Sequence, residues 1–415
     1  MTHSIRAVLA LLVCTMLAAC ATHAPVSGSG GAVDASHAPA VVLISIDGFR
    51  NDYLDRGLTP NLSKLAATGV RAEGMRPSYP ALTFPNHWTL VTGLRPDRTG
   101  IVHNIMRDPA IGAFKAGNED NARDARWWNG AEPIWVTAER AGLHTATMFW
   151  PGSQAAVHGV RPTHWRAYDE RMPNDARVDQ VVEWLASKDD IRLATLYFEL
   201  LDESGHAFGP DSPQVARDIA SIDATIGRLV EELQARGLRD RVNLVIVSDH
   251  GMAEVAPGHA VAIEDMVDAR VATRIANGQV VTFAPVAGRD RAAEAALLGR
   301  HDHYACWKKN AMPPQWHYGT HPRVAPIVCQ MDEGWDAISR EEIAKRPAHA
   351  RGSHGFDPAL PSMRAVFVAN GPAFVPGATL PVFDNVDGYA LLARLLGVAA
   401  KQNDGSADTF VPALR

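Results

Sequence analysis

The sequence predicts an α/β fold: a doubly wound, mostly parallel central sheet flanked by helices, with a smaller inserted subdomain. Two observations favour this class. Several apolar runs show no polar alternation, which is typical of strands buried on both faces of a parallel sheet. Helical patterns alternate with these runs along the chain, as a doubly wound sheet requires. We expect strands at residues 41–46, 194–201, 241–247 and 365–369.

Helix signals separate the expected strands. Pro60 stands near the start of one helix and Gly69 just past its end, which is the usual placement of both residues. The clearest helix opens at Ser212–Pro213 and stops at Gly237. Its apolar face is formed by Ile219, Ile222, Ile226, Leu229 and Leu233. Further helices are expected after Pro85 and at residues 132–140 and 177–186.

The N-terminal residues carry an export signal. Arg6 precedes an apolar run from Ala7 to Ala18, which is too short to span a membrane. The following Leu-Ala-Ala-Cys ends at Cys20 and resembles a bacterial lipobox. We therefore expect a signal peptide at residues 1–20 and a periplasmic protein that is lipid-anchored at Cys20. An ordinary signal peptide with an incidental cysteine is the alternative.

Residues 21–38 are rich in Gly, Ser, Ala and Pro, as in a flexible tether. The remaining residues, 39–415, are enough for one large α/β domain with insertions. The net charge of −6 offers no basic field for a polynucleotide. Small anionic substrates stay compatible with this charge, because bound metal ions can supply positive charge locally.

The regular pattern weakens between residues 254 and 350, where we expect the inserted, cap-like subdomain. Cys306 and Cys329 flank a loop rich in Pro and His, and in an exported protein two such cysteines are expected to pair. Two separate buried thiols are the alternative. The same region contains four histidines whose spacing favours a surface subdomain over a third metal site: His301, His303, His317 and His321.

Metal-ligand side chains stand where the expected strands end. Asp47 follows the first strand, Asp202 the second, and Asp249–His250 the third, while His206 lies four residues beyond Asp202. In open α/β sheets the working site lies outside the carboxyl ends of the strands, so these groups are expected to share one crevice. Any one of the aspartates alone would be better explained as a turn former or a helix cap.

Three further residues are candidates for chemistry. Thr83 stands just before Pro85 and an expected helix, so its hydroxyl would face free backbone N–H groups, a position that favours an attacking oxygen and a phosphate. A simple helix cap is its alternative role. Asn104, in a turn-rich segment, can donate to an oxyanion or merely close a turn. His354, between two glycines in Gly-x-His-Gly, is a candidate last ligand.

In this order, the motifs Asp-Gly, Thr-Phe-Pro-Asn-His, Asp-x-x-x-His, Ser-Asp-His-Gly-Met and Gly-x-His-Gly resemble those of bacterial nucleotide pyrophosphatase/phosphodiesterases of the alkaline phosphatase superfamily. The resemblance covers nearly all of residues 40–400 and implies an alkaline phosphatase-like catalytic domain with two Zn²⁺ ions. One ion would be held by Asp47, Asp249 and His250 with Thr83 as nucleophile, the other by Asp202, His206 and His354. The resemblance also implies that Asn104 binds a phosphoryl oxygen and that Phe84 and Tyr197 clasp a nucleotide base.

The expected reaction is hydrolysis of small nucleotide diesters and pyrophosphates to nucleoside 5′-monophosphates through a phosphothreonine. Zinc coordination of the threonine hydroxyl would ionise it, and a second ion would stabilise the leaving oxygen. Thr83-Phe84-Pro85 lacks the C/S-x-P-x-R motif of sulfatases. A phosphomonoesterase with a Thr nucleophile, a diesterase acting on lipid headgroups, and a lipoprotein that captures zinc or phosphate without turnover are the alternatives.

Overall fold

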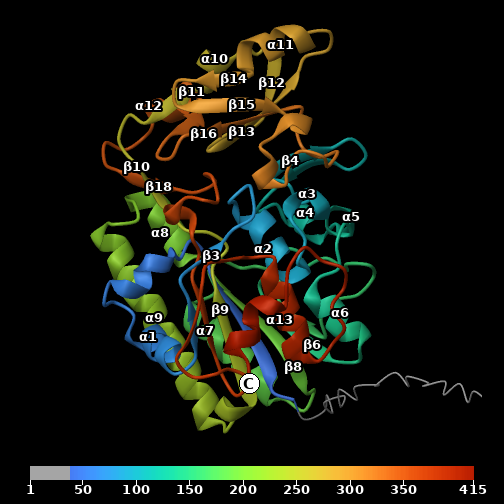
Figure 1. Cartoon of the computed structure of the whole chain (residues 1–415), viewed down its shortest axis with the longest axis vertical. Helices are drawn as coiled ribbons and strands as arrows, with labels where there is room; N and C mark the ends of the chain where they lie inside the picture. The colour runs from blue at the N-terminus through green and yellow to red at the C-terminus, as the bar shows by residue number, and fades with distance from the viewer. Residues whose placement is uncertain (1–37) are drawn as a thin grey trace, which may run out of the picture. The chain divides into compact units, whose positions relative to one another are not determined.

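A computed structural model describes residues 38–415 of the chain. Its central element is an eight-stranded mixed sheet (Figure 1), which confirms the expected α/β class. In spatial order its strands are β20 (Ala378–Leu380), β2 (Val70–Ala72), β19 (Phe367–Asn370), β9 (Val242–Val247), β1 (Ala40–Ile46), β8 (Ile191–Phe198), β6 (His144–Met148) and β7 (His164–Trp165).

The middle of the sheet is parallel. β1 pairs with both β8 and β9 in parallel register, and β6 continues the parallel run beyond β8. The expected last strand is shorter than residues 365–369 predict, because β19 begins at Phe367 and runs antiparallel to β9. The sheet is therefore doubly wound and mostly parallel, with an antiparallel strand toward one edge.

Helices cover both faces of the sheet, and side chains alternate between them. Val41 and Leu43 of β1 pack in one apolar core, whereas Val42 and Ile44 pack in the other. The first core contains residues of α2 (Thr83–Thr92), α6 (Ile134–Arg140) and α13 (Asp387–Leu396). The second contains residues of α1 (Pro60–Ala67), α7 (Asn174–Ala186) and α9 (Pro213–Ala235).

The long helix α9 shows how the sequence pattern becomes packing. Its expected apolar face is fully buried, and the Ser212 side chain accepts a hydrogen bond from the Val215 amide to cap the helix. The helix ends at Ala235, two residues before Gly237, whose positive φ stops it. The short helices expected at residues 132–140 and 177–186 correspond to α6 and α7.

One expected strand end is wrong. The residues before Asp202 do not continue as strand to Leu201, because β8 stops at Phe198 and Glu199 adopts a helical backbone. The chain then forms α8 (Leu200–Phe208), and Asp202 lies in its first turn. Asp47 and Asp249–His250 therefore follow strands, whereas Asp202 lies in the first turn of a helix.

A second sheet lies within residues 254–350, at the top of Figure 1. We call it the small sheet. Cys306 and Cys329 lie opposite each other on adjacent strands and form a disulfide, which confirms their expected pairing. The small sheet consists of β12 (Ala272–Ala276), β13 (Val280–Pro285), β16 (Ile327–Met331), β15 (Tyr304–Lys308) and β14 (Gly299–His301).

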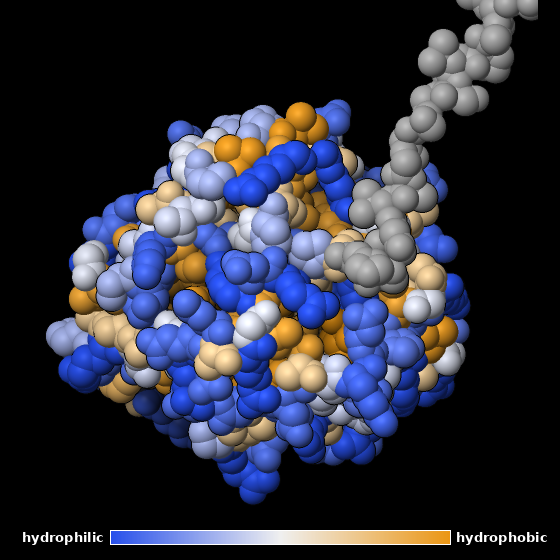
Figure 2. Space-filling view, turned by 90° about the horizontal axis from the view of Figure 1, so that it is seen from below, coloured by the Kyte–Doolittle hydropathy of each residue, from blue (hydrophilic) through white to orange (hydrophobic). Residues whose placement is uncertain are grey.

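The expected signal peptide, the acylated Cys20 and nearly all of the tether lie outside the described residues. Among residues 38–415, no helix is both long and apolar enough to cross a membrane. On the face shown in Figure 2, hydrophilic residues surround scattered hydrophobic ones. That mixture is ordinary for a solvent-facing surface.

Candidate metal centre and active site

The first group of ligand-type residues lies at the ends of two adjacent parallel strands, and we call it the strand-end cluster: Asp47, Asp249 and His250. Asp47 follows β1, and the other two follow β9. All three are at most 1% exposed. His250 Nε2 lies 2.8 Å from Asp249 Oδ2 and 3.6 Å from Asp47 Oδ1. The imidazole nitrogen and both carboxylates therefore converge on one point.

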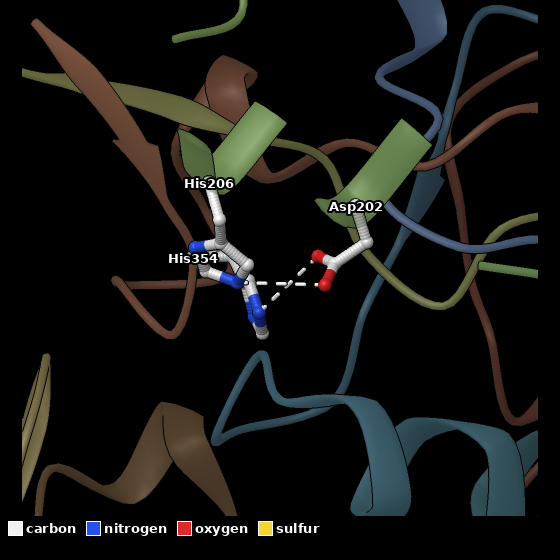
Figure 3. A group of neighbouring side chains, drawn as sticks. All are labelled: Asp202, His206 and His354. Carbon is white, nitrogen blue, oxygen red and sulfur yellow. Dashed lines mark ion pairs between the residues drawn. The ribbon is translucent and has the colours of Figure 1, made fainter. Parts of the chain in front are cut away.

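The second group, which we call the helix cluster, consists of Asp202, His206 and His354. Asp202 and His206 lie four residues apart on one face of α8, and His354 follows β18 (Arg351–Ser353). Figure 3 shows the Asp202 carboxylate facing both imidazoles. Each imidazole Nε2 lies 3.5 Å from one carboxylate oxygen of Asp202.

The two clusters adjoin. Asp202 also lies within ligand distance of Asp47 and His250, since one ligand atom from each falls within 4.8 Å of the others. Gly48 permits this approach, because a Cβ at its position would lie 3.0 Å from the Asp202 Cα and its φ is +67°. The expected ligands of the two metals are therefore brought together in one site.

The clusters fit the donor set of a metal site. One buried carboxylate oxygen of each aspartate has no hydrogen-bond partner: Oδ1 of Asp47, Oδ1 of Asp202 and Oδ2 of Asp249. Buried carboxylates without partners are costly unless a cation compensates them. Burial, together with the carboxylates of Asp249 and Asp202, raises the pKa of Asp47. Bound cations would relieve both penalties.

The three histidines of the two clusters are oriented in the same way. Nδ1–H of His206 donates to the Gly352 carbonyl at 3.1 Å, and that of His250 to the Gly251 carbonyl at 3.0 Å. Nδ1–H of His354 donates to the Ala81 carbonyl at 2.9 Å. A carbonyl can only accept, so each bond fixes the proton on Nδ1 and leaves Nε2 as a lone-pair donor, as in metal-binding histidines.

Thr83 lies at the edge of the strand-end cluster. It is the first residue of α2, rather than the cap, which is Leu82. Its Oγ1 lies 3.3 Å from His250 Nε2, and the side chain is half-buried. The expected row of free backbone N–H groups is not found in this first turn, because the Phe84 N–H donates to Asn104, Pro85 has none and the Asn86 N–H donates to the Leu82 carbonyl. What favours an anion here is the positive end of the helix dipole. The hydroxyl therefore stands beside the expected metal and at an anion-binding helix end.

Asn104 lies beside the same helix end. Its Oδ1 accepts a hydrogen bond from the Phe84 backbone N–H at 3.0 Å. This bond ties the carboxamide to the residue that follows Thr83. The Asn104 carboxamide therefore lies against the first turn of α2, near Thr83, and its role at a phosphoryl oxygen stays a prediction.

The two expected base-binding residues differ in their surroundings. Phe84 is half-buried and packs edge-on against Phe114. Tyr197 is 9% exposed, and its hydroxyl donates to Asp47 Oδ2 at 2.7 Å. The Tyr197 hydroxyl therefore holds Asp47, an expected metal ligand, whereas the contact of Tyr197 with a nucleotide base stays a prediction.

Two residues near the site were not identified from the sequence. His87 lies one turn after Thr83, with Nδ1 2.9 Å from the Thr83 carbonyl and 3.4 Å from Asp249 Oδ2. The sequence signal for His87 was its position four residues after Thr83 in Thr-Phe-Pro-Asn-His, which places both residues on one face of a helix. Tyr168 is 40% exposed and packs edge-on against Tyr197. It lies in an irregular segment, where no periodicity indicates its neighbours.

The four histidines of the histidine-rich stretch make local contacts. Among the described residues, the groupings able to hold a metal include none of its four histidines. His303 instead stacks on Trp335, and His301 stacks on Tyr304.

Comparison with known proteins places this site in a family. Residues 41–357 match the model for type I phosphodiesterase/nucleotide pyrophosphatase. Human ectonucleotide pyrophosphatase/phosphodiesterase family member 5 is 36% identical over 366 residues, which cover 88% of this chain and 76% of the human protein. A pyrophosphatase/phosphodiesterase of Schizosaccharomyces pombe is 36% identical over 395 residues, or 90% of this chain and 80% of that protein.

Comparison with solved structures gives the same family. Murine ectonucleotide pyrophosphatase/phosphodiesterase 5 has a TM-score of 0.86 and 35% identity, covering 91% of this chain and all of the murine chain. An inactive threonine-to-alanine variant of the murine protein, in complex with AMP, matches equally well. The fold, the site geometry and these matches lead to one conclusion. The chain belongs to the type I phosphodiesterase/nucleotide pyrophosphatase family.

Proposed function

We propose that this protein hydrolyses nucleoside 5′-phosphodiesters and nucleotide pyrophosphate bonds, releasing nucleoside 5′-monophosphates through a phosphothreonine on Thr83. The observation that carries the proposal is the position of Thr83, whose hydroxyl stands at a helix N-terminus beside the strand-end cluster, which in turn adjoins the helix cluster. A protein that only captured zinc or phosphate would need no nucleophile there.

The chain's own residues account for binding and orientation. Asn104, whose Oδ1 accepts from the Phe84 N–H and whose Nδ2 is left to donate, would hold a phosphoryl oxygen at the positive end of the α2 dipole. The Thr83 oxygen would then attack phosphorus, the bond to the leaving oxygen would break, and water would later hydrolyse the phosphothreonine. Two bound zinc ions would supply the positive charge that ionises the Thr83 hydroxyl and stabilises the leaving oxygen.

Zinc is favoured by the composition of the clusters. Each offers imidazole nitrogen and carboxylate oxygen, with three protein ligands, as catalytic zinc sites do. Chelation should therefore abolish turnover, and zinc should restore it better than magnesium. Active protein containing clearly fewer than about 1.5 zinc ions per chain would contradict the paired site.

The named relatives support nucleotide substrates. The murine variant is described with AMP, and a Xenopus laevis protein 33% identical to this chain is named a bis(5′-adenosyl)-triphosphatase. The neutral Asn104 fits the single negative charge of a diester.

One experiment compares kcat/KM of the purified protein for a nucleotide diester, an aryl phosphomonoester and a glycerophosphodiester. We expect the nucleotide diester to be preferred. Preference for the monoester or the glycerophosphodiester would replace the proposal with the corresponding alternative.

We also propose that the protein is bacterial, exported to the periplasm and acylated at Cys20. The lipobox-like sequence and the Cys306–Cys329 disulfide, a bond that oxidising compartments favour, support this location. Cells labelled with a radioactive fatty acid should incorporate it into the wild-type protein but not into Cys20→Ser. Equal labelling of both proteins would exclude this anchor.

A further inference from the structure

One end of the small sheet contacts the active site. Val280 in β13 and Gln330 in β16 are directly opposite each other in antiparallel register. They are 1% and 7% exposed. Hydrogen bonds run from this one cross-strand pair to two separate active-site segments, residues 103–104 and 354–355. β13 and β16 both lie at the top of Figure 1.

The first segment is anchored through His103. Its Nε2–H donates to the Val280 carbonyl at 3.0 Å, and its Nδ1 accepts from the Ile105 backbone N–H at 2.9 Å. Burial lowers the pKa of His103 to about 4, so the ring is neutral at pH 7 and each nitrogen keeps one role. Asn104 lies between the two anchored residues. The bond to Val280 therefore limits where its carboxamide can lie.

The second segment is anchored through Gln330. Its Nε2 donates to the Gly355 carbonyl at 3.2 Å, directly after the ligand His354. The same amide nitrogen lies within hydrogen-bond distance of two backbone carbonyls at the end of the small sheet, 3.2 Å from that of Gln279, directly before β13, and 3.0 Å from that of Met331. The side chain thus connects the end of the small sheet to the loop that carries His354.

A further bond holds the chain on the other side of His354. Arg351 Nη1 donates to Asp336 Oδ2 at 2.8 Å, and the Asp336 side chain is 1% exposed. The Gln279 side chain also donates to Asp336. His354 therefore lies between two tethers, at Arg351 and at Gly355.

We propose that the Val280–Gln330 pair positions Asn104 and His354 together, with His103 and Gln330 as the positioning residues. The part of this proposal that concerns Asn104 rests on the proposed function. The part that concerns His354 rests on metal binding, which is measured without substrate. The competing explanation is that these bonds only satisfy buried polar groups and stabilise the fold.

A matched pair of variants tests His103. In His103→Gln the amide nitrogen reaches the place of Nε2 and can still donate to Val280. In His103→Asn the shorter side chain can accept from Ile105 but does not reach Val280. We expect kcat/KM for a nucleotide diester to fall roughly tenfold to a hundredfold in His103→Asn. His103→Gln should recover most of that loss, and both variants should bind zinc as the wild type does.

Gln330→Met tests the second anchor, because methionine keeps the length and loses the donor. We expect zinc to bind the full-length protein about tenfold more weakly at one of its two sites, measured by competition with a chelator. If Gln330→Met does not fold, Gln330→Asn, one methylene shorter and still polar, takes its place. Thr282→Val, a buried change further along β13, is the control and should alter neither readout.

The proposal would be overturned if the folded variants behaved like Thr282→Val in zinc affinity and kcat/KM and differed only in melting temperature. It would also be overturned if His103→Gln were as impaired as His103→Asn. An inactive wild-type protein would remove the proposed function, and the zinc affinity of Gln330→Met would still decide whether the small sheet positions His354.

Discussion

The two ligand clusters are built differently although they adjoin. The strand-end cluster takes its residues from β1 and β9, which are hydrogen-bonded neighbours in the middle of the sheet, and its side chains are at most 2% exposed. The helix cluster takes its residues from α8 and from the loop after β18. Side chains there are 18% exposed at Asp202 and 33% at His206.

This difference has a physical consequence. Ligands at the ends of adjacent strands are placed by the ladder hydrogen bonds of the sheet itself. Ligands on a helix and a distant loop depend on the packing of those elements, and the more exposed site exchanges with solvent more readily. We therefore expect the strand-end cluster to hold its metal and nucleophile rigidly, and the helix cluster to lose its metal first.

The largest predicted effect concerns the nucleophile of the strand-end cluster. Thr83→Ala removes the hydroxyl that is placed for the covalent route, so kcat should fall by at least about three orders of magnitude. Steady-state kinetics on a nucleotide diester measures the loss, and metal analysis should still find both ions. Thr83→Ser keeps the hydroxyl and should stay within about tenfold of the wild type. Thr83→Ala with activity near that of Thr83→Ser would show that water attacks directly.

The next prediction compares the two clusters by removing one histidine side chain from each. His206→Ala should lower activity on the order of a hundredfold and leave one zinc ion per chain, because the helix cluster then keeps only two of its three protein ligands. His250→Ala should be worse in both activity and melting temperature, since it leaves buried carboxylates without a partner. Zinc content and thermal unfolding check both variants. If both lost the same metal and the same stability, the contrast between the clusters would not exist.

The same contrast explains what the sequence predicted well. Strands buried on both faces form continuous apolar runs, so the ends of β1 and β9, and with them Asp47, Asp249 and His250, were located by pattern alone. The apolar face of α9 was equally clear. These features depend on local sequence and on a regular period.

The sequence was less informative where contacts between distant segments decide the structure. The apolar run through Leu201 fits a strand, and only the packing of α8 turns Asp202 into a helix residue. His354 lies in a short motif whose place is set by ties to the small sheet, where strands are short and irregularly spaced. The role of the Tyr197 hydroxyl and the exposure of Tyr168 depend on neighbours far away in sequence.

A smaller effect is expected at the rim of the site, where Phe84 and the exposed Tyr168 offer aromatic faces. Stacking of a base on such faces contributes ~1–3 kcal/mol per base. Phe84→Ala combined with Tyr168→Ala should therefore lower kcat/KM for a nucleotide diester by roughly tenfold or more, and barely change it for a methyl aryl phosphate. Equal losses on both substrates would mean that the rings support the fold or the metals instead.

The smallest predicted effect concerns Tyr197, whose expected role differs from that of Tyr168 because its hydroxyl contacts the strand-end cluster. Tyr197→Phe keeps the ring and removes only the 2.7 Å hydrogen bond to Asp47. A hydrogen bond to a charged group contributes about 1.5–3 kcal/mol, and bound metal would compensate part of its loss, so we expect a several-fold fall in kcat. The fall should be the same on nucleotide and baseless diesters, because the hydroxyl acts on a ligand of the strand-end cluster. A loss confined to the nucleotide substrate would instead assign Tyr197 to base binding, as the family resemblance implies.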